Sequence, residues 1–287
     1  MFHINKKDIQ QRFPNLCQPR PSNAHKGTLG TVGIVGGSVG MSGAVVLSSM
    51  AALKTGCGKV FAGFNQTALP LPYLPCQPEI MLDTAENLIK RKDINAWVIG
   101  CGLGQNIQAQ KILDNILFSK KFSPLLLDAD ALNLLAQLDE ESIFRLPEKS
   151  TRILTPHPME AARLLHCSVD DIQKNREQSA IKIAQRYQAW VVLKGENSVI
   201  AHFDGTIIVN DSGNPSLATA GSGDVLSGII GSLLAQKIPA GQAVYGGVWL
   251  HGKAGEMLAA QGLSIGATAG EIINQVRLLR HQLTMSN

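Results

Sequence analysis

Residues 219–230 read Thr-Ala-Gly-Ser-Gly-Asp-Val-Leu-Ser-Gly-Ile-Ile, a glycine-rich turn that runs directly into apolar residues. The apolar side chains return at helical spacing, so the pattern predicts a helix over 224–235. Glycine allows successive backbone N–H groups to converge, and the start of a helix adds positive potential. We therefore predict an anion hole suited to a phosphate, formed by Gly221, Ser222 and Gly223.

Asp224 closes this turn and admits two interpretations. A carboxylate beside an anion hole is well placed to take a proton from a substrate hydroxyl. A lone Asp at the same position would simply cap the helix. Because Asp224 follows Gly-Ser-Gly and other glycine-rich segments occur in the chain, we favour the catalytic interpretation.

Similar clusters follow the other apolar runs of the chain. Predicted strands cover 31–35, 96–99, 125–127, 153–154 and 190–193. Each is followed at once by glycine or polar residues, at 36–38, 100–104, 128–133, 155–160 and 194–198. Ligands of open α/β sheets bind at the carboxyl ends of the strands, so these clusters predict one extended site.

Strands alternate with helices along the chain, which predicts an α/β fold with a mainly parallel central sheet flanked by helices on both faces. A further strand is expected over 59–64, and a loop over the proline-rich stretch 68–78. Two late runs separated by Asp204-Gly205, over 198–203 and 206–210, predict an antiparallel edge hairpin. The other helices are expected over 43–54, 106–118, 159–165, 172–187, 241–260 and 268–279.

One domain is expected over 26–287, preceded by an irregular N-terminal arm over 1–25 with one helical turn at most. The formal net charge is only +4, and no nucleic-acid-binding motif occurs, so an anionic small molecule suits the chain better than DNA or RNA. No apolar stretch reaches the length of a membrane span. The five cysteines are widely spaced, so we expect neither a zinc site nor disulfide bonds. Free thiols of this kind predict a cytoplasmic location.

The ordered motifs resemble one family across about residues 26–280. They are Lys26-Gly27 with Gly30, Gly36-Gly37-Ser38 with Gly43-Ala44, Gly100 to Gly104, Asp128-Ala129-Asp130-Ala131-Leu132, Thr155-Pro156-His157-Pro158, Lys194-Gly195, Thr219 to Asp224, and His251-Gly252. The Gly-Ser-Gly-Asp string looks like the signature of ribokinase-like kinases. The whole set resembles the ADP- or ATP-dependent NAD(P)H-hydrate dehydratases of that superfamily.

This resemblance implies a hydro-lyase that repairs nicotinamide nucleotides. Such an enzyme phosphorylates the hydroxyl of hydrated NADH or NADPH, the (6S) hydrates NADHX and NADPHX, and eliminates phosphate to restore the reduced cofactor. It implies Mg²⁺ as cofactor and ADP or ATP as co-substrate. It also implies a homo-oligomer, possibly a tetramer, working with a separate NAD(P)H-hydrate epimerase.

The resemblance also implies roles for particular residues. Asp224 is the expected catalytic base. The expected substrate-binding residues are Ala44, Gly104, His157 and Asp224, and the expected nucleotide-binding residues are Lys194, Gly195, Glu196, Asn197, Ser198 and Gly223. Met159 stands where the family commonly has Gly, and Cys101 where it commonly has Pro, so both alter loops that carry substrate contacts.

Several side chains keep a second interpretation. His157 either contacts the substrate or is a solvent-facing loop histidine, and Lys194 pairs either with a phosphate or with an Asp of the fold. Asp128 and Asp130 either help to hold Mg²⁺ through water or cap the helix that follows, so no direct metal ligand is assigned. His251 fits a packed helix histidine better than a catalytic one.

Two other functions remain open at this point. A ribokinase-like vitamin-precursor or sugar kinase would share Asp224 but release a stable phosphorylated product. A non-catalytic nucleotide sensor would need the pocket without the base, and the intact Gly-Ser-Gly-Asp argues against it.

Overall fold

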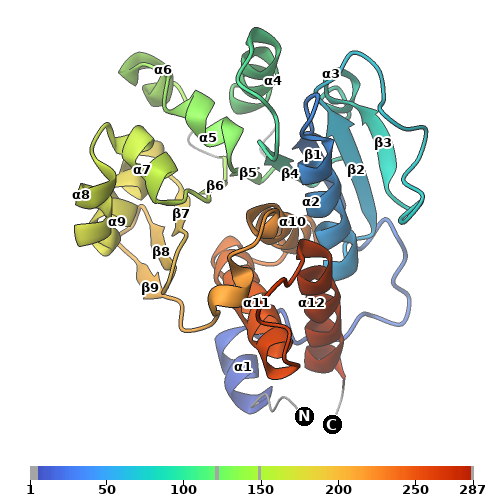
Figure 1. The fold of residues 1–287 in the computed structure, drawn as a ribbon. Coiled ribbons are helices and arrows are strands. Elements are labelled where there is room, and N and C mark those ends of the chain that lie inside the picture. Colours follow the sequence, from blue (N-terminus) through green and yellow to red (C-terminus); the bar gives the residue numbers. More distant parts are fainter. Residues whose placement is uncertain (1–5, 120–122, 148–149, 286–287) are drawn as a thin grey trace.

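The computed structural model describes residues 6–119, 123–147 and 150–285, and its centre is one nine-stranded sheet (Figure 1). The strands lie in the order β3-β2-β1-β4-β5-β6-β7-β8-β9. All pairs from β3 to β7 are parallel, while β8 and β9 join antiparallel at one edge. This confirms the predicted fold class, including the edge hairpin. The strands are β1 Thr31–Gly36, β2 Lys59–Phe64, β3 Met81–Thr84, β4 Ala96–Ile99, β5 Leu125–Leu127, β6 Arg152–Leu154, β7 Trp190–Leu193, β8 Val199–His202 and β9 Ile207–Val209.

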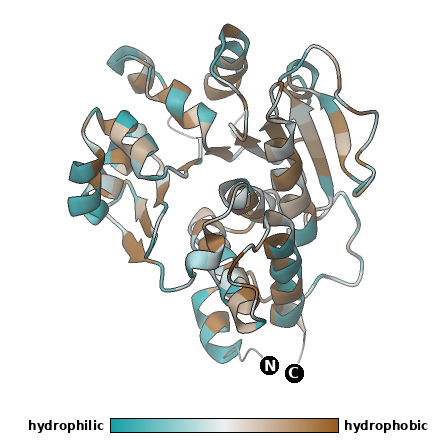
Figure 2. Cartoon of the chain, in the orientation of Figure 1, coloured by the Kyte–Doolittle hydropathy of each residue, from teal (hydrophilic) through white to brown (hydrophobic). Residues whose placement is uncertain are grey.

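Helices cover both faces of the sheet, because alternate residues of each strand point to opposite sides. On β4, Val98 packs into one hydrophobic cluster and Ile99 into the other. One face carries α2 Ser42–Thr55, α10 Ser222–Ala235, α11 Ala240–Ala260 and α12 Ala269–Thr284. The other carries α3 Ala85–Leu88, α4 Ile107–Leu117, α5 Asp130–Leu135, α6 Glu140–Phe144, α7 Pro158–Leu165, α8 Val169–Lys174 and α9 Arg176–Tyr187. Figure 2 shows hydrophobic residues gathered in the sheet, with hydrophilic residues on outer helices such as α8 and α9.

Helices α2 and α10 pack backbone against backbone. A Cβ built on Gly228 of α10 would lie 2.1 Å from the carbonyl oxygen of Ser48 in α2, so only glycine fits there. Both helices start at the carboxyl edge of the sheet, where the predicted site lies. Both end at the amino edge, where a Cβ on Gly30 would meet the carbonyl of Ala235 at 2.0 Å. The pair therefore spans the molecule from one edge of the sheet to the other.

The N-terminal arm is more ordered than expected. It contains α1 Lys6–Arg12, and the side chains of Phe13 and Leu16 after it are fully buried. Phe13 meets the ring of Tyr245 edge-on, with ring centroids 4.8 Å apart, so the arm packs on α11. The first five residues of the arm lie outside the described residues, and the division into arm and domain stays a prediction.

The helix predicted over 172–187 is wrong as a single element. Ser168 and Asp171 form a capping box that starts α8 earlier, and Asn175 leaves the helical conformation between α8 and α9. Arg176 then donates to the carbonyl of Leu193 at 3.0 Å, which fixes α9 against β7. Elements of three to five residues were also missed: β3, α3, α6 and the 3-10 turn Pro215–Leu217. No described helix is long and apolar enough to cross a membrane.

Candidate active site

The clusters that follow the strands meet at the carboxyl edge of the sheet. The N–H groups of Gly37 and Ser38 donate to the carbonyls of Cys101 and Gly102, at 3.0 and 2.7 Å. These bonds join the loops after β1 and β4. Further along, the N–H of Lys194 after β7 donates to the carbonyl of Pro156 after β6, at 2.8 Å. The predicted segments therefore form one continuous rim.

Asp130 ties a further pair of loops together at this rim. Its carboxylate accepts hydrogen bonds from the N–H of Gly104 at 2.8 Å and from the amide of Gln105 at 3.0 Å. Asp130 is the first residue of α5, and no side chain caps the start of this helix among the described residues. Its observed role is to hold the Gly104 loop in place.

The glycine-rich turn leads into α10, but the N–H of Ser222, predicted as part of the anion hole, already donates to the carbonyl of Thr219 at 3.3 Å. The helix begins at Ser222, two residues earlier than predicted, and its N-cap Gly221 has φ 83° and no side-chain cap. Among the described residues, the N–H groups of Gly223 and Asp224 have no hydrogen-bond partner. Free N–H groups at a helix start attract anions. The capping interpretation of Asp224 is not what the structure shows.

Asp224 faces a cavity of about 570 Å³ on this rim. Burial, followed by the negative charge of Asp128, raises the pKa of Asp224 to about 6. Cys101 and Lys194 act in the opposite direction. A base with a pKa near neutrality both accepts a proton readily and is largely ionised at pH 7. The cavity is lined by Gly40, Met41, Gly43, Ala44, Leu47, Gly102, Ala129, Asp130, Asn133, Glu160, Ala220, Gly221 and Asp224.

A buried ionic network supports Asp224 from below. Asp128 accepts from the ammonium of Lys194 at 2.8 Å and from the hydroxyl of Ser227 at 2.7 Å. Lys194 also lies 3.9 Å from the carboxylate of Glu160. Burial disfavours the charged form of Lys194, but the carboxylates of Asp128 and Glu160 outweigh it and raise its pKa. The Asp of the fold is thus the observed partner of Lys194, and its contact with a phosphate stays a prediction.

Cys101, Asp128 and Asp224 each place a ligand atom within 4.8 Å of the other two. This trio does not suit Mg²⁺ as a direct ligand set, because Mg²⁺ prefers oxygen and the thiol is a soft ligand. Moreover, both oxygens of Asp128 are already engaged by Lys194 and Ser227.

His157 is the N-cap of α7. Its Nδ1 accepts from the N–H groups of Met159 and Glu160, at 3.1 and 3.3 Å, and its Nε2 lies 3.3 Å from the Glu160 carboxylate. Burial and the charge of Lys194 lower the pKa of His157. Burial raises the pKa of Glu160 to about 7. A neutral imidazole with its proton on Nε2 satisfies these contacts, and 45% of the side chain stays exposed for a ligand.

The predicted nucleotide segment Lys194, Gly195, Glu196, Asn197 and Ser198 is the loop between β7 and β8, and its three middle residues are exposed. Gly195 has φ 138°, and the Ser198 hydroxyl donates to its carbonyl at 3.0 Å. A Cβ on Gly223 would lie 3.5 Å from the ammonium of Lys194, so this loop borders the anion hole. Ala44, in the first turn of α2, lies on the other side of Asp224 and lines the cavity.

His251 is a packed histidine of α11, as predicted, but it also contacts the anion hole. Its Nε2 lies 3.0 Å from the Ser222 hydroxyl, and both side chains are buried. Burial lowers the pKa of His251 to about 4, so the ring is neutral at pH 7. The sequence had not connected the two residues.

The arrangement of the strands, the Gly-Ser-Gly-Asp turn and the cavity beside it define a ribokinase-like enzyme. A ribokinase-like superfamily protein from Enterococcus faecalis shares this fold with a TM-score of 0.82 and 27% identity, over 100% of this chain and 99% of that one. A family model described as NAD(P)H-hydrate dehydratase matches residues 32–277. The chain belongs to this family.

Individual relatives agree with this assignment. An ADP-dependent (S)-NAD(P)H-hydrate dehydratase from Neisseria meningitidis is 49% identical, over 100% of this chain and 99% of that protein. The crystal structure of an ADP/ATP-dependent NAD(P)H-hydrate dehydratase from Bacillus subtilis, co-crystallised with ATP and Mg²⁺, matches with a TM-score of 0.85 and 30% identity over 97% of both chains. A bifunctional NAD(P)H-hydrate repair enzyme from Escherichia coli is 38% identical over 96% of this chain, which spans 53% of its length.

Proposed function

We propose that this protein is an ADP-dependent hydro-lyase that converts the S form of hydrated NADH or NADPH back to the reduced nucleotide. The observation that carries the proposal is Asp224, a carboxylate with a pKa of about 6 beside two free N–H groups. The hydroxyl of a substrate can contact the carboxylate of Asp224 while a phosphoryl group binds the two N–H groups.

In the first step, Asp224 takes the proton of the substrate hydroxyl while the hydroxyl oxygen attacks the terminal phosphorus of ADP. The phosphorus–oxygen bond to AMP breaks, and AMP leaves with the bonding electrons. The N–H groups of Gly223 and Asp224 hold the charge of the transferring phosphoryl group, and Lys194 adds positive charge nearby. When bound, Mg²⁺ would neutralise part of the phosphate charge, with the nucleotide phosphates as its main ligands.

In the second step, the phosphate leaves the ring. Hydroxide is a poor leaving group and phosphate a good one, so phosphorylation makes the elimination possible. The ring nitrogen supplies electrons as the carbon–oxygen bond breaks, and the neighbouring ring carbon loses a proton. We propose that the nicotinamide lies in the cavity lined by Ala44. Gly104 and His157 do not line it, but they contact Asp130 and Glu160, which do.

The partners of the reaction are part of the same proposal. An NAD(P)H-hydrate epimerase would convert the other epimer into the S form that this enzyme uses. The extra length of the bifunctional relatives supports a second activity beside this one. A homo-oligomer in the cytoplasm remains our expectation.

The decisive experiment mixes purified protein, S-form hydrated NADH, Mg²⁺ and either ADP or ATP, and follows the reduced-nicotinamide absorbance. Recovery that requires nucleotide, with release of inorganic phosphate, is the expected result. A stable phosphorylated product would instead indicate a small-molecule kinase. Nucleotide binding without consumption would indicate a sensor.

The turnover rate should depend on pH through Asp224. Its ionised form is the base, and its pKa is raised from 3.8 to about 6, so kcat/KM should fall as the pH drops through about 6 and level off above 7. Replacing Cys101 by Ala removes a contact that lowers this pKa. The acid limb of the pH–rate profile should then move to higher pH, while Cys76→Ala, an exposed cysteine elsewhere, should leave it in place. A profile that is flat from pH 5 to pH 8 would argue against Asp224 as the base.

A further inference from the structure

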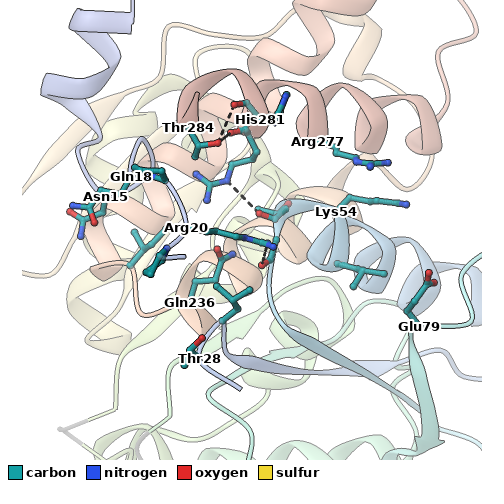
Figure 3. Close-up of a pocket in the computed structure, with 18 of the residues that line it drawn as sticks. Asn15, Gln18, Arg20, Thr28, Lys54, Glu79, Gln236, Arg277, His281 and Thr284 are labelled. Carbon is teal, nitrogen blue, oxygen red and sulfur yellow. Dashed lines mark hydrogen bonds between the residues drawn. The ribbon is translucent and has the colours of Figure 1, made fainter. Parts of the chain in front are cut away.

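A second cavity, of about 680 Å³, lies at the opposite edge of the sheet from Asp224 (Figure 3). Its walls come from the N-terminal arm, from the segments before β1 and β3, from the last turns of α2 and α12, and from the residues that follow α10. None of the residues predicted for the active site lines it. Its volume is that of a small-molecule site.

The lining of this cavity carries an excess of positive charge. Four cationic side chains, Arg20, Lys54, Arg277 and Arg280, face a single carboxylate, Glu79. Within the described ranges, none of the four makes an ion pair, and Glu79 accepts a hydrogen bond from a neutral Gln side chain. In Figure 3 the side chains of Lys54 and Arg277 project in the same direction.

The side chains of Arg20 and Arg280 bond only to backbone oxygens among the described residues. Arg280 donates to the carbonyls of Thr55 and Leu16, and Arg20 donates to the carbonyl of Gly56 at 2.7 Å. Burial, together with the charge of Arg20, lowers the pKa of Arg280 to about 10. The carbonyls satisfy the N–H groups of the two guanidinium groups but leave their positive charges uncompensated. An anion in the cavity would therefore offset the repulsion between Arg20 and Arg280.

A purely structural role explains part of this arrangement. Thr55 and Gly56 end α2, and cations near the end of a helix stabilise its dipole. That role accounts for Arg20 and Arg280. It also accounts for Lys54, which lies in the last turn of α2 and whose charge acts on Glu79. It does not account for Arg277, whose guanidinium makes no hydrogen bond within the described part of the chain, nor for the cavity itself.

We propose that this cavity is a second ligand site, which binds a phosphate-bearing small molecule. The planar guanidinium groups of Arg20 and Arg280 suit two oxygens of one phosphate, and Lys54 with Arg277 supplies charge at the mouth. Among the described residues no Phe, Tyr or Trp lines the cavity, so the proposed recognition depends on charge and not on stacking. The side-chain amide of Gln18 also lines the cavity, whereas the amide nitrogens of Gln77 and Gln236 already donate to Glu79 and Ser232 and leave only their oxygens for a ligand.

The test is isothermal titration of the full chain with inorganic triphosphate, without nucleotide or Mg²⁺. Three proteins are compared: wild type, the charge reversal Lys54→Glu/Arg277→Glu, and the matched reversal Lys111→Glu/Lys182→Glu on exposed positions of α4 and α9. Both double variants change the net charge equally. We expect binding at this cavity to weaken about tenfold or more in the first variant only. Arg20→Gln should weaken it as well.

Thermal unfolding of each variant shows whether the fold is kept. Wild type that binds no triphosphate would overturn the proposal. So would equal binding by the two double variants, because the anion would then lie at the Asp224 rim or on the general surface. Since the titration involves no hydrated nucleotide, its outcome is independent of the proposed dehydration.

Discussion

Asp224→Asn should abolish most turnover while leaving the protein at least as stable as wild type. Loss of the base is expected to lower kcat about 10²–10⁴-fold. Asn keeps the size of the side chain and the two N–H groups of the anion hole, so ADP should still bind. A loss confined to kcat is the signature of a group that acts in the chemical step.

Stability should move in the opposite direction for an electrostatic reason. The folded protein raises the pKa of Asp224 from 3.8 to about 6, so ionisation of this carboxyl favours the unfolded chain. This ionisation lowers the free energy of unfolding. The loss is absent below about pH 4, grows as the pH rises toward 6, and reaches at most about 3 kcal/mol at pH 7. Because Asn carries no charge, the variant does not suffer this loss of stability.

Both effects can be measured on the same preparations, as kcat with ADP and as the free energy of unfolding at pH 7 and at pH 4. The gain in stability should shrink at the lower pH. Retention of wild-type kcat would remove Asp224 from the mechanism. A large loss of stability would show instead that Asp224 holds the fold together.

Lys194→Met should destabilise the fold by about 3–5 kcal/mol, because it leaves the buried carboxylates of Asp128 and Glu160 without their cation. The destabilisation should be smaller at lower pH, because Glu160 can then become protonated and neutral. Its pKa is about 7 in the presence of Lys194, whose charge lowers it, so removing Lys194 should raise this pKa further. Stability of the variant should therefore improve as the pH falls from 8 to 6.

Urea denaturation measures this cost, with Lys182→Met on the exposed side of α9 as the control. The control should stay within about 0.5 kcal/mol of wild type. Adding Asp128→Asn to Lys194→Met should recover part of the loss, because it removes the uncompensated charge. If Lys194→Met costs less than about 1 kcal/mol, the network does not carry the buried charge as described.

The architecture followed closely from the sequence, since buried parallel strands are short continuous apolar runs and each was bounded by glycine or polar residues. The half-exposed edge strand β3 has no such run, and α3 and α6 are too short for a helical period to repeat. The break at Asn175 depends on a contact between Arg176 and a distant strand. The local sequence pattern around Asn175 does not indicate that contact.

For the site, the sequence placed Asp224 and the rim but not the groups beneath them. Asp128 and Lys194 were each noticed at the end of a strand, yet their pairing joins β5 to β7 across 66 residues. Glu160 was overlooked, although its position three residues after His157 is the spacing of a capping box. Cys101 was taken as a change in loop shape, and only the fold brings its thiol beside Asp224.

The rim is built from two groups of loops that meet at Asp224. In the reaction we propose, the turn at the start of α10 and the loop after β7 form the phosphate side, while loops after β1, β4 and β5 form the cavity side together with the first residues of that turn. Because these loops are separate in the chain, changes on the cavity side can alter which hydroxyl is presented without disturbing how the phosphoryl group is held. Such a division would allow the acceptor to change while the proposed phosphoryl-transfer chemistry is kept.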